Sequence, residues 1–348
     1  MMRRLHLTCL VLLCFAAGHL VSCSTGPRHR AMVQFKEAPS PSVKGQFPNW
    51  QFPPHELETT IYQRALAGKL HGEEVKRTAQ GTTGALYLVT KDEVTGKELK
   101  WKLKKMVRGW LDSFNTSFRK ELAAYEVQKL FLDPEDYVVP TALTICVLRE
   151  RYMEVVGYAA ASLDGTNCVL CLASTWLVDV TIPDKLYDES RFLEDPTYAY
   201  FMSNFNILTY LIQHRDARVG QFLVSKDDKQ RQLFSIDNGI SFGFWPYNFL
   251  ITQWDTIHLP ALRQDSIDRL RKIQRQDLAN LEVIAQLEKN ENGILLPVQP
   301  GENMNPKNGA TYKDGTVQFG LTTSEIDDLW ERIQTLIAEV DSGNIQVF

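Results

Sequence analysis

Hydrophobic and polar residues alternate in two stretches of the first half of the chain. Residues 85–90 read ALYLVT, and residues 99–103 alternate apolar residues with lysines. Such alternation predicts two β-strands, and the DEVTGKE between them predicts the turn of a hairpin. Residues 118–131 instead space their apolar side chains as in a helix, which Pro134 would end.

Two further segments of the first half have a recognisable pattern. Residues 55–68 predict a first helix, and residues 137–161 predict one or two strands.

The spacing becomes mainly helical in the second half. A long apolar helix is expected at residues 198–213. Two short apolar runs follow at residues 221–225 and 232–236, and the charged residues between them predict a second hairpin.

The last part of the chain combines helical patterns with a proline- and glycine-rich stretch. Residues 265–290 predict two amphipathic helices, with Asp265 as an N-cap. Residues 293–315 are expected to form a long irregular loop. The pair Thr322–Glu325 has the spacing of a capping box and opens a final helix, which should stop before Gly343.

A strand-rich first part and a helix-rich second part predict an α+β fold with two lobes. The expected divisions are a signal peptide at residues 1–22, a proline-rich tether at 23–55, a strand-rich lobe at 56–150, a helical lobe at 151–290, and an irregular loop with a final helix at 291–348.

The N-terminus has the three features of an exported lipoprotein. Arg3 and Arg4 are followed by an apolar run that is too short to span a bilayer, which favours a signal peptide. The sequence LVSC then ends in Cys23, and this resembles a lipobox, whose cysteine is acylated. Ser24 after it is typical of sorting to the outer membrane, facing the periplasm or the cell surface. The alternative is an ordinary signal peptide that contains a cysteine.

Composition and charge exclude some partners. Charged residues make up 23% of the chain and hydrophobic residues 44%, as in ordinary globular proteins. The net charge is −4 before Arg3 and Arg4 are removed with a signal peptide. A mildly acidic chain has no electrostatic basis for binding nucleic acid or an anionic membrane surface.

Three cysteines remain beyond the expected signal sequence and Cys23, namely Cys146, Cys168 and Cys171. An oxidising compartment would allow one disulfide and leave at least one thiol unpaired. The CVLC segment has the spacing of a redox motif, but its apolar surroundings favour a buried segment. The sequence contains no second CxxC or histidine pair to complete a zinc site.

Five sequence features occur in the order that phosphoryl transfer needs. They are a glycine-bearing turn with Gly81 and Gly84, a lysine on a strand at Lys102, a carboxylate on a helix at Glu121, an aspartate at Asp216 after the long apolar helix, and a second aspartate at Asp237 after a β-run. Such groups bind phosphates, orient a lysine, accept a hydroxyl proton and hold a metal. Each feature alone also occurs in ordinary turns and solvated surfaces, and Lys100, Lys104 and Lys105 compete with Lys102.

The segments HRDARVGQFLVS (214–225) and FSIDNGISFG (234–243) resemble the catalytic and metal-binding loops of atypical, kinase-fold phosphotransferases. The likeness is greatest to the secretory-pathway kinases of the Golgi casein kinase family and their bacterial relatives, and phosphatidylinositol 3/4-kinases are more distant. The segment LKWKLKK resembles that family's lysine strand, which selects Lys102, although Lys104 remains a rival. The segment FRKELAAYEVQ resembles its glutamate helix, which selects Glu121.

The resemblance implies a role for each residue. Asp216 would be the catalytic base, and Asp237 would hold Mg²⁺ or Mn²⁺ on the phosphates of ATP. Lys102, paired with Glu121, would contact the α- and β-phosphates, and the Gly81–Gly84 turn would cover them. The chain departs from this pattern at Gln221, five residues after Asp216. At the corresponding position, kinases have a metal-binding Asn and the Golgi casein kinase group has Glu.

Three functions are compatible with these features. The first is an active, membrane-anchored kinase that transfers phosphate from the nucleotide to a protein or small-molecule hydroxyl. The second is an inactive kinase-fold scaffold that binds a partner. The third is a lipid or sugar kinase, and transfer of the nucleotide instead of the phosphate is a further possibility.

Overall fold

The computed structural model describes residues 45–57, 70–77, 86–92, 96, 98–109, 111–112, 117–215, 219–228, 232–243 and 254–348. All of them belong to one compact unit, Val33–Phe348. The predictions for Cys23, Gly81, Gly84 and Asp216 lie outside the described residues. Within this part of the chain, no helix is both long enough and apolar enough to cross a membrane.

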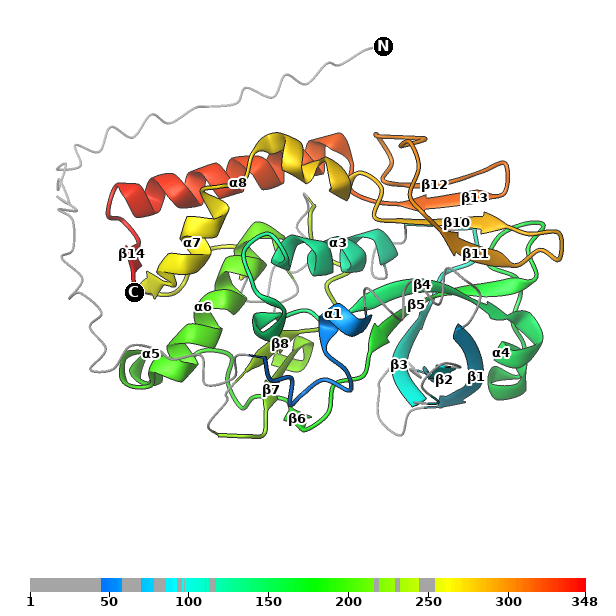
Figure 1. The fold of residues 1–348 in the computed structure, drawn as a ribbon, viewed down its shortest axis with the longest axis horizontal. Helices are drawn as coiled ribbons and strands as arrows, with labels where there is room; N and C mark the ends of the chain where they lie inside the picture. Colours follow the sequence, from blue (N-terminus) through cyan, green and yellow to red (C-terminus); the bar gives the residue numbers. More distant parts are fainter. Residues whose placement is uncertain are drawn as a thin grey trace, which may run out of the picture. The chain divides into compact units, whose positions relative to one another are not determined.

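The first sheet has five antiparallel strands in the order β1-β2-β3-β5-β4 (Figure 1). Its strands are β1 (Leu70–Arg77), β2 (Leu86–Asp92), β3 (Glu98–Lys105), β4 (Ala142–Leu148) and β5 (Cys168–Thr175). β2 and β3 confirm the hairpin that the alternation predicted. Because β5 belongs to this sheet, the sheet extends beyond residue 150, where the sequence placed a boundary between lobes.

β5 is buried on both faces, which explains its unbroken apolar sequence. Val169 and Cys171 pack in the core against β2 and β3, whereas Leu170 and Leu172 pack against α3 (Phe118–Gln128) and a second sheet. A disulfide joins Cys146 of β4 to Cys168, and Cys171 is buried and free.

α3 confirms the helix predicted at residues 118–131, and it packs against both β4 and α6 (Pro196–Leu211). A 3-10 turn, η2 (Pro134–Asp136), follows it. The prediction of strands throughout residues 137–161 is only partly right, because β4 is followed by helix α4 (Arg149–Val156). The charged RERYMEVV sequence of α4 has one buried residue and suits a surface helix.

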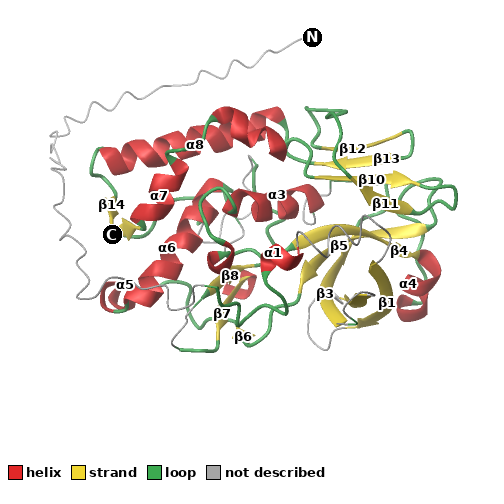
Figure 2. Ribbon diagram, viewed as in Figure 1, coloured by secondary structure: helices red, strands yellow, loops and turns green. Residues whose placement is uncertain are grey.

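The helical part contains α5 (Glu189–Glu194), α6, α7 (Gln264–Leu270) and α8 (Thr323–Asp341), which Figure 2 shows in red. α6 confirms the long apolar helix, and its apolar residues face a large core on most sides. The capping box at the start of α8 is confirmed, since the Thr322 and Glu325 side chains bond each other's backbone N–H groups.

Short strands complete the helical part. The three-stranded sheet has the order β6-β7-β8, with β6 at Val180–Thr181, β7 at Phe222–Ser225 and β8 at Leu233–Ser235. β7 and β8 confirm the second predicted hairpin, and the 3-10 turn η3 (Val219–Gln221) leads into β7. A parallel pair links β9 (Ala261–Leu262) to β14 (Gln346–Val347).

The prediction for residues 265–315 is wrong in large part. The first amphipathic helix is α7, but Arg263 and not Asp265 is its N-cap residue, and the second is the 3-10 helix η4 (Arg275–Leu281). The rest forms a four-stranded antiparallel sheet, β11-β10-β13-β12. Its strands are β10 (Ala285–Lys289), β11 (Leu295–Val298), β12 (Ala310–Lys313) and β13 (Thr316–Phe319). Four- and five-residue strands carry too little alternation to be read from sequence.

Two further differences concern the N-terminal side. The tether predicted to extend to residue 55 ends earlier, because Asn49 and Trp50 are buried in the core of the unit. Of the helix predicted at residues 55–68, the described part contains α1 (Pro54–Glu56). The mixed α+β class is confirmed by the sheets and helices together.

Candidate functional site

Three segments far apart in the sequence meet at the side chain of Lys104. Lys104 lies on β3, and its ammonium Nζ forms ion pairs with Glu121 of α3 and with Asp237, which follows β8. The partners are 17 and 133 residues away along the chain. Strand, helix and loop are therefore brought together by one cation.

The backbone after Asp237 completes this contact. The N–H of Asn238 donates to the second carboxylate oxygen of Glu121 at 2.9 Å. One oxygen of Glu121 thus accepts from Lys104 and the other from Asn238. Asp237 itself has a φ of 69°, in the left-handed region that non-glycine residues rarely occupy. Its neighbours hold it there, since the Asn238 side chain bonds the Ser235 hydroxyl and carbonyl. Strained backbone of this kind is enriched at functional sites.

The two loops singled out by the sequence lie side by side. The N–H of Phe242 donates to the carbonyl of Ile212 at 2.7 Å, and the N–H of Arg215 donates to that of Ile240 at 3.5 Å. The His-Arg-Asp and Asp-Asn-Gly segments are thus joined through their backbones. Asp216, the next residue after Arg215, lies outside the described part.

His214 and Arg215, which precede Asp216, have structural contacts. His214 is fully buried, and its ring packs against Phe222 with ring centroids 5.6 Å apart. The Arg215 guanidinium pairs with the carboxylate of Asp255 at 3.4 Å.

Burial and charge act in opposite directions on this cluster. Burial would raise the pKa of Asp237, but the positive charge and hydrogen bond of Lys104, together with Lys102 and His214, lower it below its ordinary value. Burial would likewise lower the pKa of Lys104, but the carboxylates of Glu121 and Asp237 raise it overall. Both groups are therefore held in their charged forms.

Lys102 differs from Lys104 although the two share one face of β3. It is half-buried, and among the described residues it forms no ion pair. Burial lowers its pKa, the neighbouring charge of Lys104 lowers it further, and Asp237 and Glu121 offset this only in part. Lys102 is consequently a cation without a bonded counter-charge beside the cluster.

The structure brings together Glu121, Asp237 and a lysine of β3, but that lysine is Lys104. The resemblance had selected Lys102 as the partner of Glu121, and the period-two geometry of a strand explains the ambiguity, since both lysines point to the same face. Gln221 is buried, and its carbonyl accepts from the N–H of Ile236, one residue before Asp237. Within the described ranges, no three His, Cys, Asp or Glu side chains gather as a metal site.

Sequence reasoning missed a buried glutamine, Gln128, which links α3 to the segment that bonds β8 near Asp237. The Gln128 side chain of α3 accepts from the N–H groups of Val138 and Val139 and donates to the carbonyl of Val139. The carbonyl of Val138 in turn accepts from the N–H of Ser235, two residues before Asp237. The only sequence signal was a polar residue on the apolar side of a predicted helix.

The CVLC segment does not form a redox pair. Cys168 and Cys171 are three positions apart on one strand, so their side chains point to opposite faces of the sheet. Burial raises the pKa of the Cys171 thiol to about 12. The interpretation as a buried segment is confirmed, and the disulfide uses Cys146 instead.

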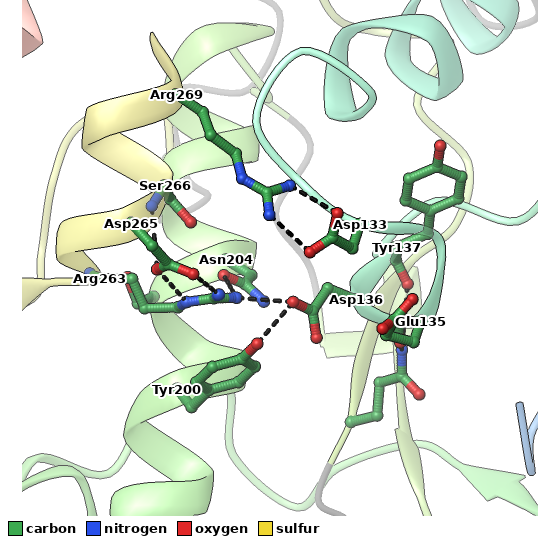
Figure 3. Close-up of polar contacts among 12 residues, drawn as sticks. Asp133, Glu135, Asp136, Tyr137, Tyr200, Asn204, Arg263, Asp265, Ser266 and Arg269 are labelled. Atoms are coloured by element: carbon green, nitrogen blue, oxygen red, sulfur yellow. Dashed lines mark hydrogen bonds and ion pairs between the residues drawn. The ribbon is translucent and has the colours of Figure 1, made fainter. Parts of the chain in front are cut away.

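A second cluster of buried charges connects η2 to α6 and α7 (Figure 3). The Asp136 carboxylate accepts from the Tyr200 hydroxyl at 2.6 Å and from the Arg263 guanidinium at 2.8 Å. The guanidinium also stacks on the Tyr200 ring at 3.7 Å and bonds Asn204 and Asp265. We call these residues the Arg263 cluster. The guanidinium of Arg263 is surrounded by protein groups that bond or stack on it.

A cavity between α3 and the β10–β11 region is not lined by the charged residues of either cluster. It measures about 670 Å³ and is lined by α3, the start of β4, and residues in the ranges 279–286 and 297–303. Neither Lys104 nor Asp237 contributes to its wall.

The chain was compared with known proteins. No model of a protein family matches it, and no curated protein matches it significantly. The candidate function therefore depends on the geometry and on the sequence motifs.

Proposed function

We propose that this protein is a membrane-anchored phosphotransferase with a two-lobed, kinase-like fold, which moves the γ-phosphate of ATP to a protein or small-molecule hydroxyl. The observation that supports it is the meeting of Lys104, Glu121 and Asp237, from a strand, a helix and a loop. Phosphoryl transfer needs this set of groups, because its catalysis consists mainly of positioning and charge neutralisation.

In this proposal Lys102 and Lys104 have different roles. Lys104 is engaged by two carboxylates and orders the site, whereas Lys102 carries the positive charge available to the phosphates. An anionic ligand beside Lys102 would relieve the repulsion from Lys104 that lowers its pKa. Lys102 thus keeps the role expected from the sequence, and Lys104 takes the pairing with Glu121.

An aromatic pair on the same face of the sheet supports a nucleotide as the ligand. Tyr87 of β2 lies directly opposite Lys102, and its ring lies 6.2 Å from that of Trp176, centroid to centroid. The Trp176 side chain is exposed, and the backbone N–H of Trp176 donates to the backbone carbonyl of Lys100. Flat rings beside a cationic strand are suited to a base attached to phosphates.

We assign Asp237 and Gln221 as the residues that would hold Mg²⁺ or Mn²⁺. The Asp237 side chain is 35% exposed, so it retains accessible carboxylate surface besides its contact with Lys104. Carboxylate and amide oxygens are ligands that hard cations prefer, and Gln221 would offer the second. Asp237 would hold the cation, whose charge would offset that of the phosphates, and Asp216 would accept the hydroxyl proton.

The cysteines support an extracytoplasmic location, which we propose to be the outer membrane, facing the periplasm or the cell surface. The Cys146–Cys168 disulfide is of the kind that persists in oxidising compartments. Acylation of Cys23 would anchor the chain without a spanning helix. Cys23→Ala should then move the protein from the membrane to the soluble fraction, and unchanged fractionation would refute the anchor.

The direct test is transfer of labelled γ-phosphate from ATP by the full chain in detergent. An extract of the producing cells would serve as the acceptor, with Mg²⁺ or Mn²⁺ present. Asp216→Ala should abolish labelling while the far-UV circular dichroism stays unchanged, and the matched change at the exposed Asp184 should leave labelling intact. Labelling that survives in Asp216→Ala would refute the assignment of the base. A product that resists protease would identify a lipid or sugar as the acceptor.

A kinase-fold scaffold is the second candidate, and Gln221 favours it, because its side chain departs from the metal ligands of the family. The scaffold predicts nucleotide-independent partner binding that Asp237→Asn leaves unchanged. Absence of labelling with every acceptor would favour this candidate over the phosphotransferase.

A further inference from the structure

The segment between β5 and β6, residues 176–179, is the connector from the five-stranded sheet to the helical part. Residues 47–51 bind along it. The Asn49 side chain donates to the carbonyls of Val178 and Asp179 at 3.0 and 3.1 Å, and its own carbonyl accepts from the N–H of Val178 at 3.0 Å. Asn49 is buried, so these bonds are shielded from water.

Gln51 fastens the other end of the connector to the sheet. Its side-chain amide donates to the carbonyls of Trp176 at 2.7 Å and Lys100 at 2.9 Å. Its amide oxygen accepts from the N–H of Lys100 at 2.9 Å. One side chain therefore joins β3, two residues before Lys102, to the first residue of the connector.

Trp50, between these two residues, contacts the strand that leads to Asp237. It is buried, and its ring packs edge-to-face on Phe234 of β8 with centroids 5.9 Å apart. Phe234 lies three residues before Asp237. The segment thus touches both the lysine strand and the aspartate strand of the candidate site.

We propose that residues Phe47–Gln51 form a strap that fixes the connector and so sets the separation between the lysines of β3 and Asp237. Asn49 and Gln51 are its positioning residues, and this inference depends on the proposed function for its effect on ligand binding. Asp179 has a φ of 52°, a left-handed conformation that costs free energy for a non-glycine residue. Its carbonyl is held by Asn49 and by the N–H of Lys226.

The strap follows the proposed membrane anchor in the sequence. Its first residue, Phe47, lies 24 residues after Cys23, the proposed site of acylation.

The test compares Asn49→Ala/Gln51→Ala with a matched pair of exposed changes, Asn292→Ala/Gln299→Ala, in the full chain. Hydrogen exchange is measured without ligand at amides that do not bond the strap, namely those of Lys102, Lys104, Trp176 and Lys226. We expect exchange at these amides to become at least about tenfold faster than in the matched pair. In the strap variant, local opening of the connector no longer requires the side-chain hydrogen bonds of Asn49 and Gln51 to break, so it costs less free energy. Faster exchange confined to Lys100 and Val178, whose amides bond the strap directly, would overturn the proposal.

Nucleotide affinity separates this inference from the proposed function. If the wild-type chain binds ATP with Mg²⁺, the strap variant should bind it about tenfold more weakly, and the matched pair should bind normally. Unchanged affinity in the strap variant would overturn the positioning role. If the wild-type chain binds no nucleotide, the proposed function fails, and the exchange measurement alone decides whether the strap fixes the connector.

Discussion

The clusters at Arg263 and at Lys104 both bury charged side chains between distant segments, but of these two only the one at Lys104 leaves charge available to a ligand. In the Arg263 cluster the side chains of Arg263 and Asp136 are 7% and 3% exposed. At Lys104, Glu121 and Asp237, the Lys104 cluster, the exposed fractions are 13%, 6% and 35%, so Asp237 reaches solvent. Lys102 lies beside it without an ion pair in the described part of the chain.

Both clusters bury charge, but they differ in how completely each charge is compensated. A closed cluster in which each charge faces its counter-charge and an aromatic ring anchors segments to one another. A cluster with an exposed carboxylate and an uncompensated cation still has favourable interactions to gain from a ligand. The first should therefore respond to mutation in stability, and the second in binding.

The largest effect is expected from Arg263→Met. It leaves the buried Asp136 carboxylate without its cation and should lower the free energy of unfolding by about 3–5 kcal/mol. Urea denaturation measures this. As a control, Arg271→Met removes an arginine whose ion pairs are near the surface and should cost less than about 1 kcal/mol. Equal losses in both variants would mean that the Arg263 cluster is not a structural anchor.

Lys104→Met should have the next largest effect on stability, about 1–3 kcal/mol, because Glu121 and Asp237 lose their shared cation. The loss is smaller than at Arg263 because water reaches Asp237. Lys100→Met, on the same strand and face but exposed, is the matched control and should change stability little. A Lys104 variant as stable as the Lys100 variant would contradict the ordering role of Lys104.

Lys102→Met should leave stability unchanged or raise it by less than about 1 kcal/mol, since the charged form is disfavoured by burial and by Lys104. The same change should remove binding of anionic ligands. Denaturation and a thermal-shift titration with ATP, performed on the same preparation, measure the two effects. Loss of stability with retained ATP binding would reverse the roles assigned to the two lysines.

The smallest effect is a difference in acid response. Burial raises the pKa of Asp136 above its ordinary 3.8, although Arg263 and Tyr200 oppose the change. The folded state therefore binds the Asp136 proton more tightly than the unfolded state does. The stability gained from this proton binding is present below pH 3.8 and is lost as the pH rises through the folded pKa of Asp136. The pKa of Asp237 is lowered, so its contribution is present above pH 3.8 and lost as the pH falls through its folded pKa.

Unfolding free energies measured from about pH 2.5 to 6 for Asp136→Asn and Asp237→Asn, each subtracted from the wild type, should slope in opposite directions. Slopes of one sign would mean that the two carboxylates have similar surroundings.

Long and regular patterns in the sequence were sufficient to predict part of the fold. The alternation at residues 85–90 and 99–103, the helical spacing of α3 and α6, and the capping box before α8 each involve enough residues for local periodicity to dominate. The order of motifs likewise predicted that Glu121 and Asp237 belong to one site. The structure brings these two residues together at one lysine.

Other features depend on contacts that no local pattern records. The β10–β13 sheet is built from short strands whose burial comes from Phe118 and from β5, far away in the sequence. The choice between Lys102 and Lys104 depends on how α3 lies across the sheet. The strap has two polar residues, Asn49 and Gln51, in a proline-rich stretch that the sequence predicted to be a tether, and only the structure shows that they bond the connector.

The central claim is that the Lys104 cluster binds nucleotide with a metal. The most direct measurement is a thermal-shift titration of the full chain with ATP and Mg²⁺ or Mn²⁺, with Lys102→Met and Asp237→Asn as variants. At one hundred times the Kd, ATP should stabilise the wild-type fold by about 2.7 kcal/mol and raise the melting temperature by a few degrees. The account predicts that both variants lose this metal-dependent shift. Absence of a shift in the wild type, or an equal shift in all three proteins, would contradict it.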